Sequence, residues 1–256
     1  MTSTTIERAV HRVIDDMQAN LGQDLTIDDM ARIAMFSKFH FTRVFRDVTG
    51  TSPGRFLSAL RLQEAKRLLV DTTFSVADIS SQVGYSSVGT FSSRFKACVG
   101  VSPSVFRELG GFTSAIEAGA DLDDDCPSGA LRGHVTLSDG RSPGHCFVGL
   151  FPTPVPQGQP VRCAVLDGPG PFELRDIPAG TWYVLVHSVP YGSEDLPSGT
   201  GDEDTVSVGR YGPVTAHADT LLLPAEIVLR PVGALDPPVL MALLDLRANA
   251  MEHAVG

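Results

Sequence analysis

The chain has 256 residues, of which 20 are Lys or Arg and 30 are Asp or Glu, and its formal net charge is −10. No apolar run approaches the roughly 18 residues of a membrane span, and the first residues do not have the pattern of a signal peptide, so we expect a soluble, cytoplasmic protein of one large or two ordinary domains. The four cysteines, Cys98, Cys126, Cys146 and Cys163, have no C-x-x-C spacing, which argues against a zinc site or a disulfide framework and favours reduced, buried thiols.

Hydrophobic periodicity predicts that the first part of the chain is helical. The predicted helices are 6–21, 27–34, 37–49, 53–70, 76–83, a helix from 86 or 87 to about 99, and a short helix from 103. Their starts carry capping signals: Thr26 with Asp29 three residues later fits a capping box, and Ser52-Pro53 places Pro at the first helical position. We therefore expect an all-α region ending near residue 109.

The same motif occurs twice within these helices. Residues 25–37 align with 74–86 at an offset of 49, and one inserted residue then makes the offset 50, which pairs Phe41 with Phe91 and Phe45 with Phe95. Each copy has the pattern of a helix, a tight turn and a second helix. Two helix-turn-helix (HTH) units on one chain predict a DNA-binding protein.

Charge is distributed unevenly along the chain. Residues 36–112 carry a net +5, residues 113–256 a net −12 and residues 1–35 a net −3. The basic excess falls on the duplicated motif, where neutralisation of DNA phosphates requires it. The acidic remainder is expected to stay away from DNA.

The second helix of each copy is the predicted recognition helix, with Phe41, Val44, Phe45 and Val48 facing the core in the first copy. The side chains left for DNA are Lys38, Phe39, Thr42, Arg43 and Arg46 in the first copy and Ser87, Val88, Gly89, Thr90, Ser92, Ser93, Arg94 and Lys96 in the second. Arg43 suits a bidentate contact with guanine, and Phe39 fits either a thymine methyl or the small core. Since the second set is poor in long side chains, we expect the first copy to provide most base readout and the second to tighten binding.

Two stretches resemble a known family. They are R-L-Q-E-A-K-R-L-L at 61–69 and V-G-Y-S-S-V-G-T-F-S-S-R-F-K-A-C-V-G-V-S-P-S-V-F-R at 83–107. Residues 7–109 resemble the DNA-binding domain of the AraC/XylS family of bacterial transcription regulators. The resemblance implies base contacts by Phe39, Thr42 and Arg43, and by Val88, Gly89, Thr90, Ser92 and Ser93.

The chain departs from that family in two respects. Met35 stands where the family often has Gly in the first turn, and a left-handed conformation there carries some cost. In addition, many members place the effector domain before the DNA-binding domain, whereas the additional region here follows it.

Beyond residue 110 the helical pattern ends. Residues 110–129 are rich in Gly and Asp and are predicted to be a linker, and residues 237–251 to form a last apolar helix. The predicted strands are 131–137, 146–151, 161–166, 171–174, 181–189, 206–208 and 225–229. G-P-F-E-L-R-D-I-P-A-G-T-W-Y-V-L-V at 170–186 resembles the carboxypeptidase-regulatory or transthyretin-like β-sandwich, which implies a binding or structural module without catalytic residues.

The predicted fold class is multidomain α plus β. It comprises an all-α double-HTH domain at 1–109, a linker at 110–129, and an all-β sandwich with a C-terminal helix at 130–256. The histidines of the second region, His134, His145, His187 and His217, have no metal-ligand spacing with Asp167 or Asp219, and the acidic run 193–204 lacks a calcium-loop pattern. No catalytic, metal or cofactor site is expected, and the protein is not expected to be an enzyme.

These features predict a sequence-specific transcription regulator that binds double-stranded promoter DNA through two recognition helices. RNA polymerase, a small-molecule effector and a second copy of the chain remain open as further partners, and the sandwich is left open between effector binding and dimerisation. The alternative is an interaction or carrier protein whose helical repeat binds another protein; Arg43 and the basic excess argue against it.

Overall fold

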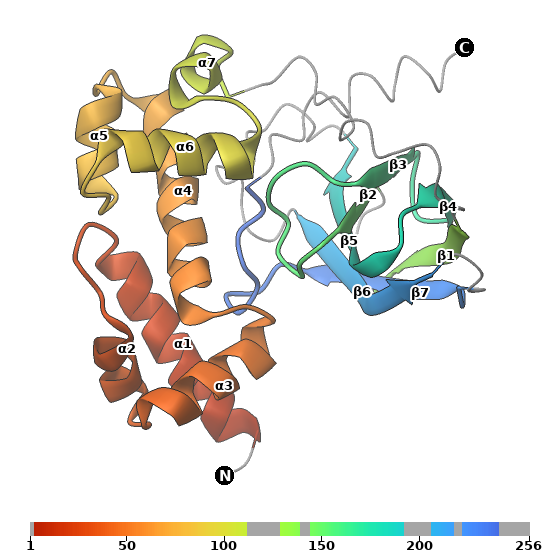
Figure 1. The fold of residues 1–256 in the computed structure, drawn as a ribbon, viewed down its shortest axis with the longest axis horizontal. Helices are drawn as coiled ribbons and strands as arrows, with labels where there is room; N and C mark the ends of the chain where they lie inside the picture. The colour runs from red at the N-terminus through yellow and green to blue at the C-terminus, as the bar shows by residue number, and fades with distance from the viewer. Residues whose placement is uncertain (1–2, 112–128, 139–143, 192–205, 218–221, 241–256) are drawn as a thin grey trace. The chain divides into compact units, whose positions relative to one another are not determined.

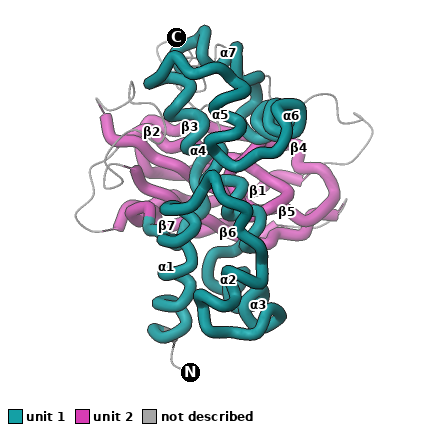
Figure 2. The backbone as a smooth tube through the Cα atoms, turned by 90° about the vertical axis from the view of Figure 1, so that its left-hand side faces the viewer, with its two compact units in different colours: residues 1–111, 233–240 teal, residues 112–232, 241–256 magenta. Residues whose placement is uncertain are grey.

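The computed structural model describes residues 3–111, 129–138, 144–191, 206–217 and 222–240. The chain divides into two compact units (Figure 2): residues 1–111 with 233–240, and residues 112–232 with 241–256. We refer to them as the helical unit and the sheet unit. The segment 233–240 therefore belongs to the helical unit although it follows the strands in the sequence.

Seven helices build the helical unit (Figure 1). They are α1 (Ser3–Ala19), α2 (Ile27–Ala34), α3 (Lys38–Thr49), α4 (Pro53–Asp71), α5 (Val76–Gln82), α6 (Val88–Val99) and α7 (Pro103–Glu108). Helices α2 and α3 form the first HTH unit, and α5 and α6 the second. The predicted all-α double-HTH arrangement is thus confirmed, with α4 joining the two HTH units.

Matching caps set where the paired helices begin. The Thr26 hydroxyl accepts a hydrogen bond from the Asp29 N–H while the Asp29 carboxylate accepts one from the Thr26 N–H, and Ser75 and Asp78 repeat this capping box at α5. The Thr26 hydroxyl also donates to the Asp29 carboxylate, and this bond, together with the one from the Thr26 N–H, lowers the pKa of Asp29. Ser87, rather than Ser86, caps α6, so the inserted residue of the second copy precedes that serine.

Aromatic pairs fill the cores of the two HTH units in the same way. Phe41, Phe45 and Phe56 make successive edge-to-face contacts, with ring centroids 5.5 Å apart in each pair. Phe91, Phe95 and Phe106 repeat the series at 5.7 and 5.5 Å. All six rings are at most 1% exposed. Such pairs add about 1 kcal/mol beyond area burial, and they fix the face that each recognition helix turns inward.

The described residues of the sheet unit form seven strands. They are β1 (Gly129–Leu137), β2 (Gly144–Phe151), β3 (Arg162–Leu166), β4 (Pro171–Ile177), β5 (Gly180–Pro190), β6 (Ser207–Ala216) and β7 (Ala225–Pro231). Their hydrogen-bonded order is β3-β2-β5-β6-β7-β1-β4, with β1 and β7 parallel and the other neighbours antiparallel. Strand β7 links two groups, because residues 225–229 pair with β1 and residues 230–231 pair with β6.

The two groups of strands share one core. The buried cluster takes Val148 and Leu150 from β2 and Val184 and Val186 from β5, and Leu131, Leu174 and Ile227 from the other group. The end strands β3 and β4 also contact each other. The expected all-β unit is confirmed, and β7 joins its two groups of strands into one seven-stranded sheet.

Strand β6 is much longer than the predicted 206–208. The prediction stopped at Gly209, and Gly212 and Pro213 follow, which usually weaken a strand. Here Gly209 is required because a Cβ atom at this position would lie 2.6 Å from the Ile227 side chain. The close approach of a neighbouring strand thus explains why a glycine occupies the middle of β6.

Two predicted elements lie largely outside the described residues. These are most of the linker, at 112–128, and most of the C-terminal helix, at 241–251. Residues 237–240, the described start of that predicted helix, have no helical structure. Within the described ranges, none of the helices has the length and apolar content required to cross a membrane.

Candidate nucleic-acid interface

The turn before α3 orients the first recognition helix. Met35 ends α2 in the left-handed conformation, with φ 59° and ψ 38°, as expected for a residue standing where glycine is common. Its N–H donates to the carbonyl groups of Ala31 and Arg32. Ser37 then caps α3 by accepting a hydrogen bond from the His40 N–H. The sequence therefore closes α2 and starts α3 within three residues.

The outward side of α3 carries the side chains predicted for DNA. Phe39 is 88% exposed, so it does not close the small core. Arg43 and Arg46 are exposed and follow Phe39 at helical spacings of four and seven residues, which places all three on one face. The Arg43 guanidinium lies 3.5 Å from His40 Nδ1. This face combines an apolar ring with two cations.

Lys38 and Thr42 each have a polar partner within the first HTH unit. The Lys38 ammonium forms an ion pair with Asp28 of α2 at 2.9 Å, and both side chains are about half exposed. The Thr42 hydroxyl donates to the Lys38 carbonyl within the helix. An exposed pair of this kind contributes at most about 1 kcal/mol, so a phosphate can compete for Lys38.

The outward side of α6 has shorter side chains. Gly89, Ser93 and Lys96 are exposed and repeat the spacing of the α3 face, and Val88 is 41% exposed. The Ser87 hydroxyl accepts from the Thr90 N–H and donates to the Thr90 hydroxyl, so both residues serve the cap. Ser92 and Arg94 are half-buried, and the Arg94 charge lowers the pKa of Tyr85 against the larger effect of burial, which raises it. Arg94 therefore lies near Tyr85, away from the Gly89 face.

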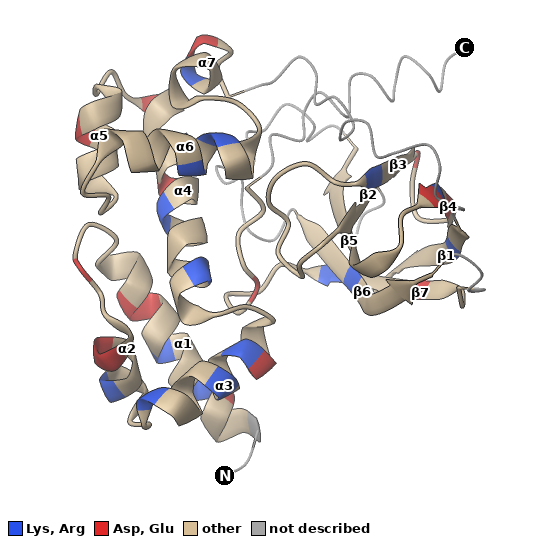
Figure 3. Ribbon diagram, in the orientation of Figure 1, with Lys and Arg blue, Asp and Glu red and all other residues tan. Residues whose placement is uncertain are grey.

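Figure 3 shows the distribution of charge over the helical unit. Lys and Arg positions lie on α3, α4 and α6, and acidic positions lie on α1, α2, α4 and α5. The acidic residues of the first turns, Asp28, Asp29 and Asp78, stabilise helix N-termini. On the recognition helices, Arg43, Arg46 and Lys96 are exposed, whereas Lys38 is paired with Asp28.

A junction between the two HTH units, made by Leu21, Gly22, Arg61 and Gly84, fixes their relative placement. Arg61 of α4 donates to the carbonyl groups of Leu21 and Gln23 at 2.9 and 2.6 Å. A Cβ atom on Gly22 would lie 2.7 Å from the Gln82 carbonyl oxygen, and one on Gly84 would collide with the Leu21 carbonyl oxygen and the Arg61 guanidinium. These residues were not singled out from the sequence, because no periodicity or motif marks a contact across 60 residues.

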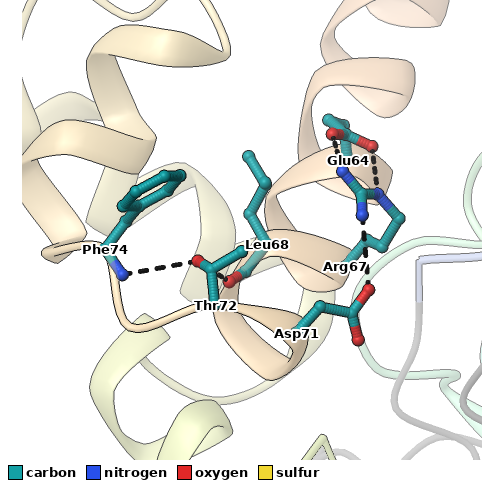
Figure 4. A network of polar contacts seen from close by, with 6 residues as sticks. All are labelled: Glu64, Arg67, Leu68, Asp71, Thr72 and Phe74. Carbon is teal, nitrogen blue, oxygen red and sulfur yellow. Dashed lines mark hydrogen bonds and ion pairs between the residues drawn. The ribbon is translucent and has the colours of Figure 1, made fainter.

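The end of α4 is stabilised by its own side chains (Figure 4). Arg67 forms ion pairs with Glu64 at 2.6 Å and Asp71 at 3.3 Å, and the hydrogen bonds that Arg67 donates to Glu64 are the main reason that the pKa of Arg67 is raised. The Thr72 hydroxyl donates to the Leu68 carbonyl and accepts from the Phe74 N–H. Arg67 is therefore a structural residue. Arg107 of α7 is another, because it donates to the Leu69 and Phe74 carbonyl groups.

A cavity of about 380 Å³ lies beside the turn of the first HTH unit. It is lined by Thr5, Arg8, Ala9, Arg12, Ala34, Met35 and Phe36. Arg8 and Arg12 are one helical turn apart on the exposed side of α1, so two guanidinium groups stand near the start of α3. Their four-residue spacing could have identified them in the sequence as an addition to the basic surface.

In the sheet unit, β2 and the turn after β3 bring His145 and Asp167 together. His145 Nδ1 lies 3.3 Å from the Asp167 carboxylate, and the His145 ring contacts Tyr191 edge to face. Among the described residues, no three His, Cys, Asp or Glu side chains are placed to hold a metal ion. Cys98 and Cys146 are buried and Cys163 is half-buried, and none of these three described cysteines forms a disulfide.

The helical unit matches known proteins. A family model described as a helix-turn-helix domain matches residues 30–109. The HTH-type transcriptional activator AarP of Providencia stuartii is 36% identical over 91 residues, covering 36% of this chain and 67% of AarP. The probable transcription factor PqrA of Proteus vulgaris is 32% identical over 106 residues, covering 41% of this chain and 87% of PqrA. The activator RclR of Escherichia coli (strain K12) is 38% identical over 96 residues, which span only 34% of its length.

Two HTH units on a shared central helix, with outward-facing basic recognition helices, define a DNA-binding protein of the transcription-regulator class. More specifically, the chain belongs to the AraC/XylS family of regulators, as residues 7–109 indicated. The match covers the helical unit, and the sheet unit lies beyond it.

Proposed function

We propose that the chain regulates transcription by placing α3 and α6 in successive major grooves of a promoter. The observation that carries this proposal is the repeated outward face: Phe39, Arg43 and Arg46 on α3 occupy the same helical positions as Gly89, Ser93 and Lys96 on α6. A major groove accepts one helix, and hydrogen-bond donors along its exposed side read base edges and phosphates.

The length of α4 supports simultaneous binding of both helices. This helix has 19 residues and is therefore about 28 Å long at 1.5 Å per residue. One turn of DNA is about 34 Å, so the ends of α4 lie at a separation suited to two adjacent grooves on one side of the duplex. The Arg61 hydrogen bonds and the glycine contacts at the junction limit how far this separation can change.

The two helices are assigned different tasks. Arg43 is assigned to guanine recognition and Phe39 to apolar contact with a thymine methyl, with Thr42 beside them, while Lys38 and Arg46 bind phosphates. On α6, Val88, Gly89, Ser92 and Ser93 approach the bases closely without long donors, Ser87 and Thr90 support the helix start, and Lys96 binds a phosphate. Among the α6 residues predicted to contact DNA, Arg94 is expected to contribute least to binding, since it lies beside Tyr85.

For the sheet unit we propose a regulatory task with no reaction assigned. Two candidates remain within it: binding of a small effector, and pairing with a second copy of the chain. A ligand would raise the thermal stability of the sheet unit and change operator affinity together, by linkage. A dimer would make the apparent affinity depend on protein concentration. Contact with RNA polymerase is proposed for activation and is tested by transcription in vitro.

Selection of bound duplexes from a random DNA pool tests the DNA-binding function in the full chain. The expected result is an enriched sequence with two elements about one helical turn apart, the first more strongly defined than the second. Titration of the selected duplex against a scrambled duplex, at several salt concentrations, then measures specificity. Equal binding to both duplexes at every salt concentration would contradict the proposal.

A further inference from the structure

The segment 233–240, which we call the strap, is part of the helical unit although it follows β7 directly. A tight turn begins it: the Asp236 carboxylate accepts a hydrogen bond from the Gly233 N–H at 2.8 Å, and the Asp236 N–H donates to the Gly233 carbonyl at 2.8 Å. Pro237, Pro238 and Leu240 are buried. A terminal segment tied down by burial and hydrogen bonds is an ordered element of its unit.

The strap contacts both halves of the helical unit. Leu235 packs on the core of the first HTH unit, the cluster that holds Phe41, Phe45 and Phe56. At its other end the Leu240 carbonyl accepts a hydrogen bond from the Lys66 ammonium of α4 at 3.2 Å. Lys66 in turn lies 5.8 Å from the ring centroid of Phe106, in the core of the second HTH unit. From Leu235 to Leu240, about 17 Å of extended chain, the strap therefore runs from the core of the first HTH unit to a lysine of α4 that itself lies against the core of the second.

Lys66 is an unusual anchor, because its side chain is buried. Among the described residues no carboxylate forms an ion pair with Lys66, and burial of the ammonium lowers the pKa of Lys66 to about 8. Its hydrogen bond to the strap carbonyl offsets part of the cost of burial. Release of the strap would return the ammonium to water but would uncover Leu235 and Leu240, so docking depends on their apolar burial.

The strap is not needed for the fold of the family. The match to PqrA extends over 87% of that protein, which leaves it no room for a sheet unit followed by a strap. The strap also does not block the recognition helices, since Phe39 and Val88 remain 88% and 41% exposed while it is docked. An addition that packs on the first HTH unit and on α4, and leaves the DNA-facing side open, is suited to setting the spacing of the two HTH units.

We propose that residues 233–240 act as a brace, which holds the two HTH units at the spacing that DNA requires and links that spacing to the sheet unit through β7. This inference rests on the proposed DNA-binding function. The docked strap selects one arrangement of α3 and α6, so that DNA does not have to select it from several. A ligand or partner that displaces β7 would act on DNA affinity through this segment.

The test uses the full chain with Leu235→Ala and Leu240→Ala combined, and Leu223→Ala as the matched control. Leu223 is 73% exposed and precedes β7, so its truncation leaves the strap in place. The double variant is expected to bind the selected duplex about 5- to 20-fold more weakly, a change within the usual range of allosteric coupling. It should also discriminate less against duplexes in which the distance between the two recognised elements is changed by one base pair. The control should match the wild type.

Amine acylation followed by mass spectrometry measures strap docking without DNA. In the wild type Lys66 should react much more slowly than the exposed Lys38, and in the double variant the two rates should converge. Asp236→Ala, which opens the strap turn without a core cavity, provides a second variant in case the first folds poorly. If Lys66 becomes reactive while affinity and spacing preference stay unchanged, or if affinity rises, the brace is refuted. If the wild type binds no DNA, the proposed function fails, whereas the Lys66 rates still decide whether the strap docks.

Discussion

Two cations of the helical unit show how surroundings divide similar side chains into different roles. Arg43 is exposed on the outer face of α3 and is available for a partner. Lys66 is buried on α4, where it donates to the Leu240 carbonyl. Arg67, its neighbour in the sequence, is held by Glu64 and Asp71. Sequence composition counts all three equally as positive charge, and only their burial and partners separate the candidate DNA contact from the structural residues.

Replacement of Arg43 tests base recognition at the residue scale. In Arg43→Ala, discrimination at one base pair of the selected site should fall by about 1–3 kcal/mol, roughly 5- to 150-fold, because a bidentate contact is lost. Arg43→Lys keeps the charge without the planar pair of donors, so it should recover non-specific affinity more than discrimination. Binding of single-base variants of the site measures both quantities. A uniform loss for every base would assign Arg43 to a phosphate instead.

Burial of Lys66 predicts a specific pH dependence of stability. Its pKa of about 8 in the folded chain lies below the value of about 10.5 in the unfolded chain. Between these values the unfolded chain binds the proton that the folded chain has lost, so the free energy of unfolding rises with pH. Relative to Lys66→Met, the wild type should gain about 3 kcal/mol from pH 7 to pH 10.5. Chemical denaturation followed by helical circular dichroism measures this, and parallel pH profiles would show that Lys66 is solvated.

At the scale of elements, the helices of the first 109 residues were predicted with their types and nearly their bounds. This success has a local cause: capping serines, Ser-Pro pairs and apolar periodicity act within a few residues. The long extent of β6 could not be predicted, because Gly209 is required by the neighbouring Ile227 rather than by local conformation. The junction of Arg61, Gly22 and Gly84 was missed for the same reason, since its partners are distant in the sequence.

Two glycine substitutions separate local from tertiary requirements. Gly84→Ala should lower the free energy of unfolding by about 2–3 kcal/mol, because φ is +85° and the added Cβ meets the Leu21 carbonyl and Arg61. Gly54→Ala in α4 is the control: no atom lies within 4 Å of its Cβ position, so helix propensity should raise stability by about 0.5–1 kcal/mol. Denaturant titration of the full chain measures both. Equal effects would remove the argument for a rigid junction.

At the scale of the whole molecule, charge separates the binding region from the rest. The net charge is +5 for residues 36–112 and −12 for residues 113–256. Long-range repulsion keeps the acidic part off a polyanion and leaves the helical unit to approach it. The composition of the complete chain therefore conceals a DNA-binding region, which becomes visible only when charge is counted by segment.

This separation predicts a measurable salt dependence. If about five phosphates are neutralised, the logarithm of the association constant should fall linearly with the logarithm of salt concentration, with a slope of about −4 to −5. Lys96→Gln should reduce the magnitude of the slope by about one and weaken binding to all sequences equally. Fluorescence anisotropy with a labelled duplex measures both. Removal of an acidic surface charge in the sheet unit, Glu226→Gln, should leave the slope unchanged.

The sequence by itself determined the repeated HTH pattern, the family, and the positions of the seven described helices and of most of the described strands. These follow from caps, periodicity and a duplicated motif, which act over short distances. The tertiary structure alone decided that Phe39 is exposed, that Arg61 is structural, that His145 meets Asp167, and that residues 233–240 pack on the helical unit. The physical reason is that burial and hydrogen bonding between distant residues depend on how the elements pack, which local sequence preferences do not specify.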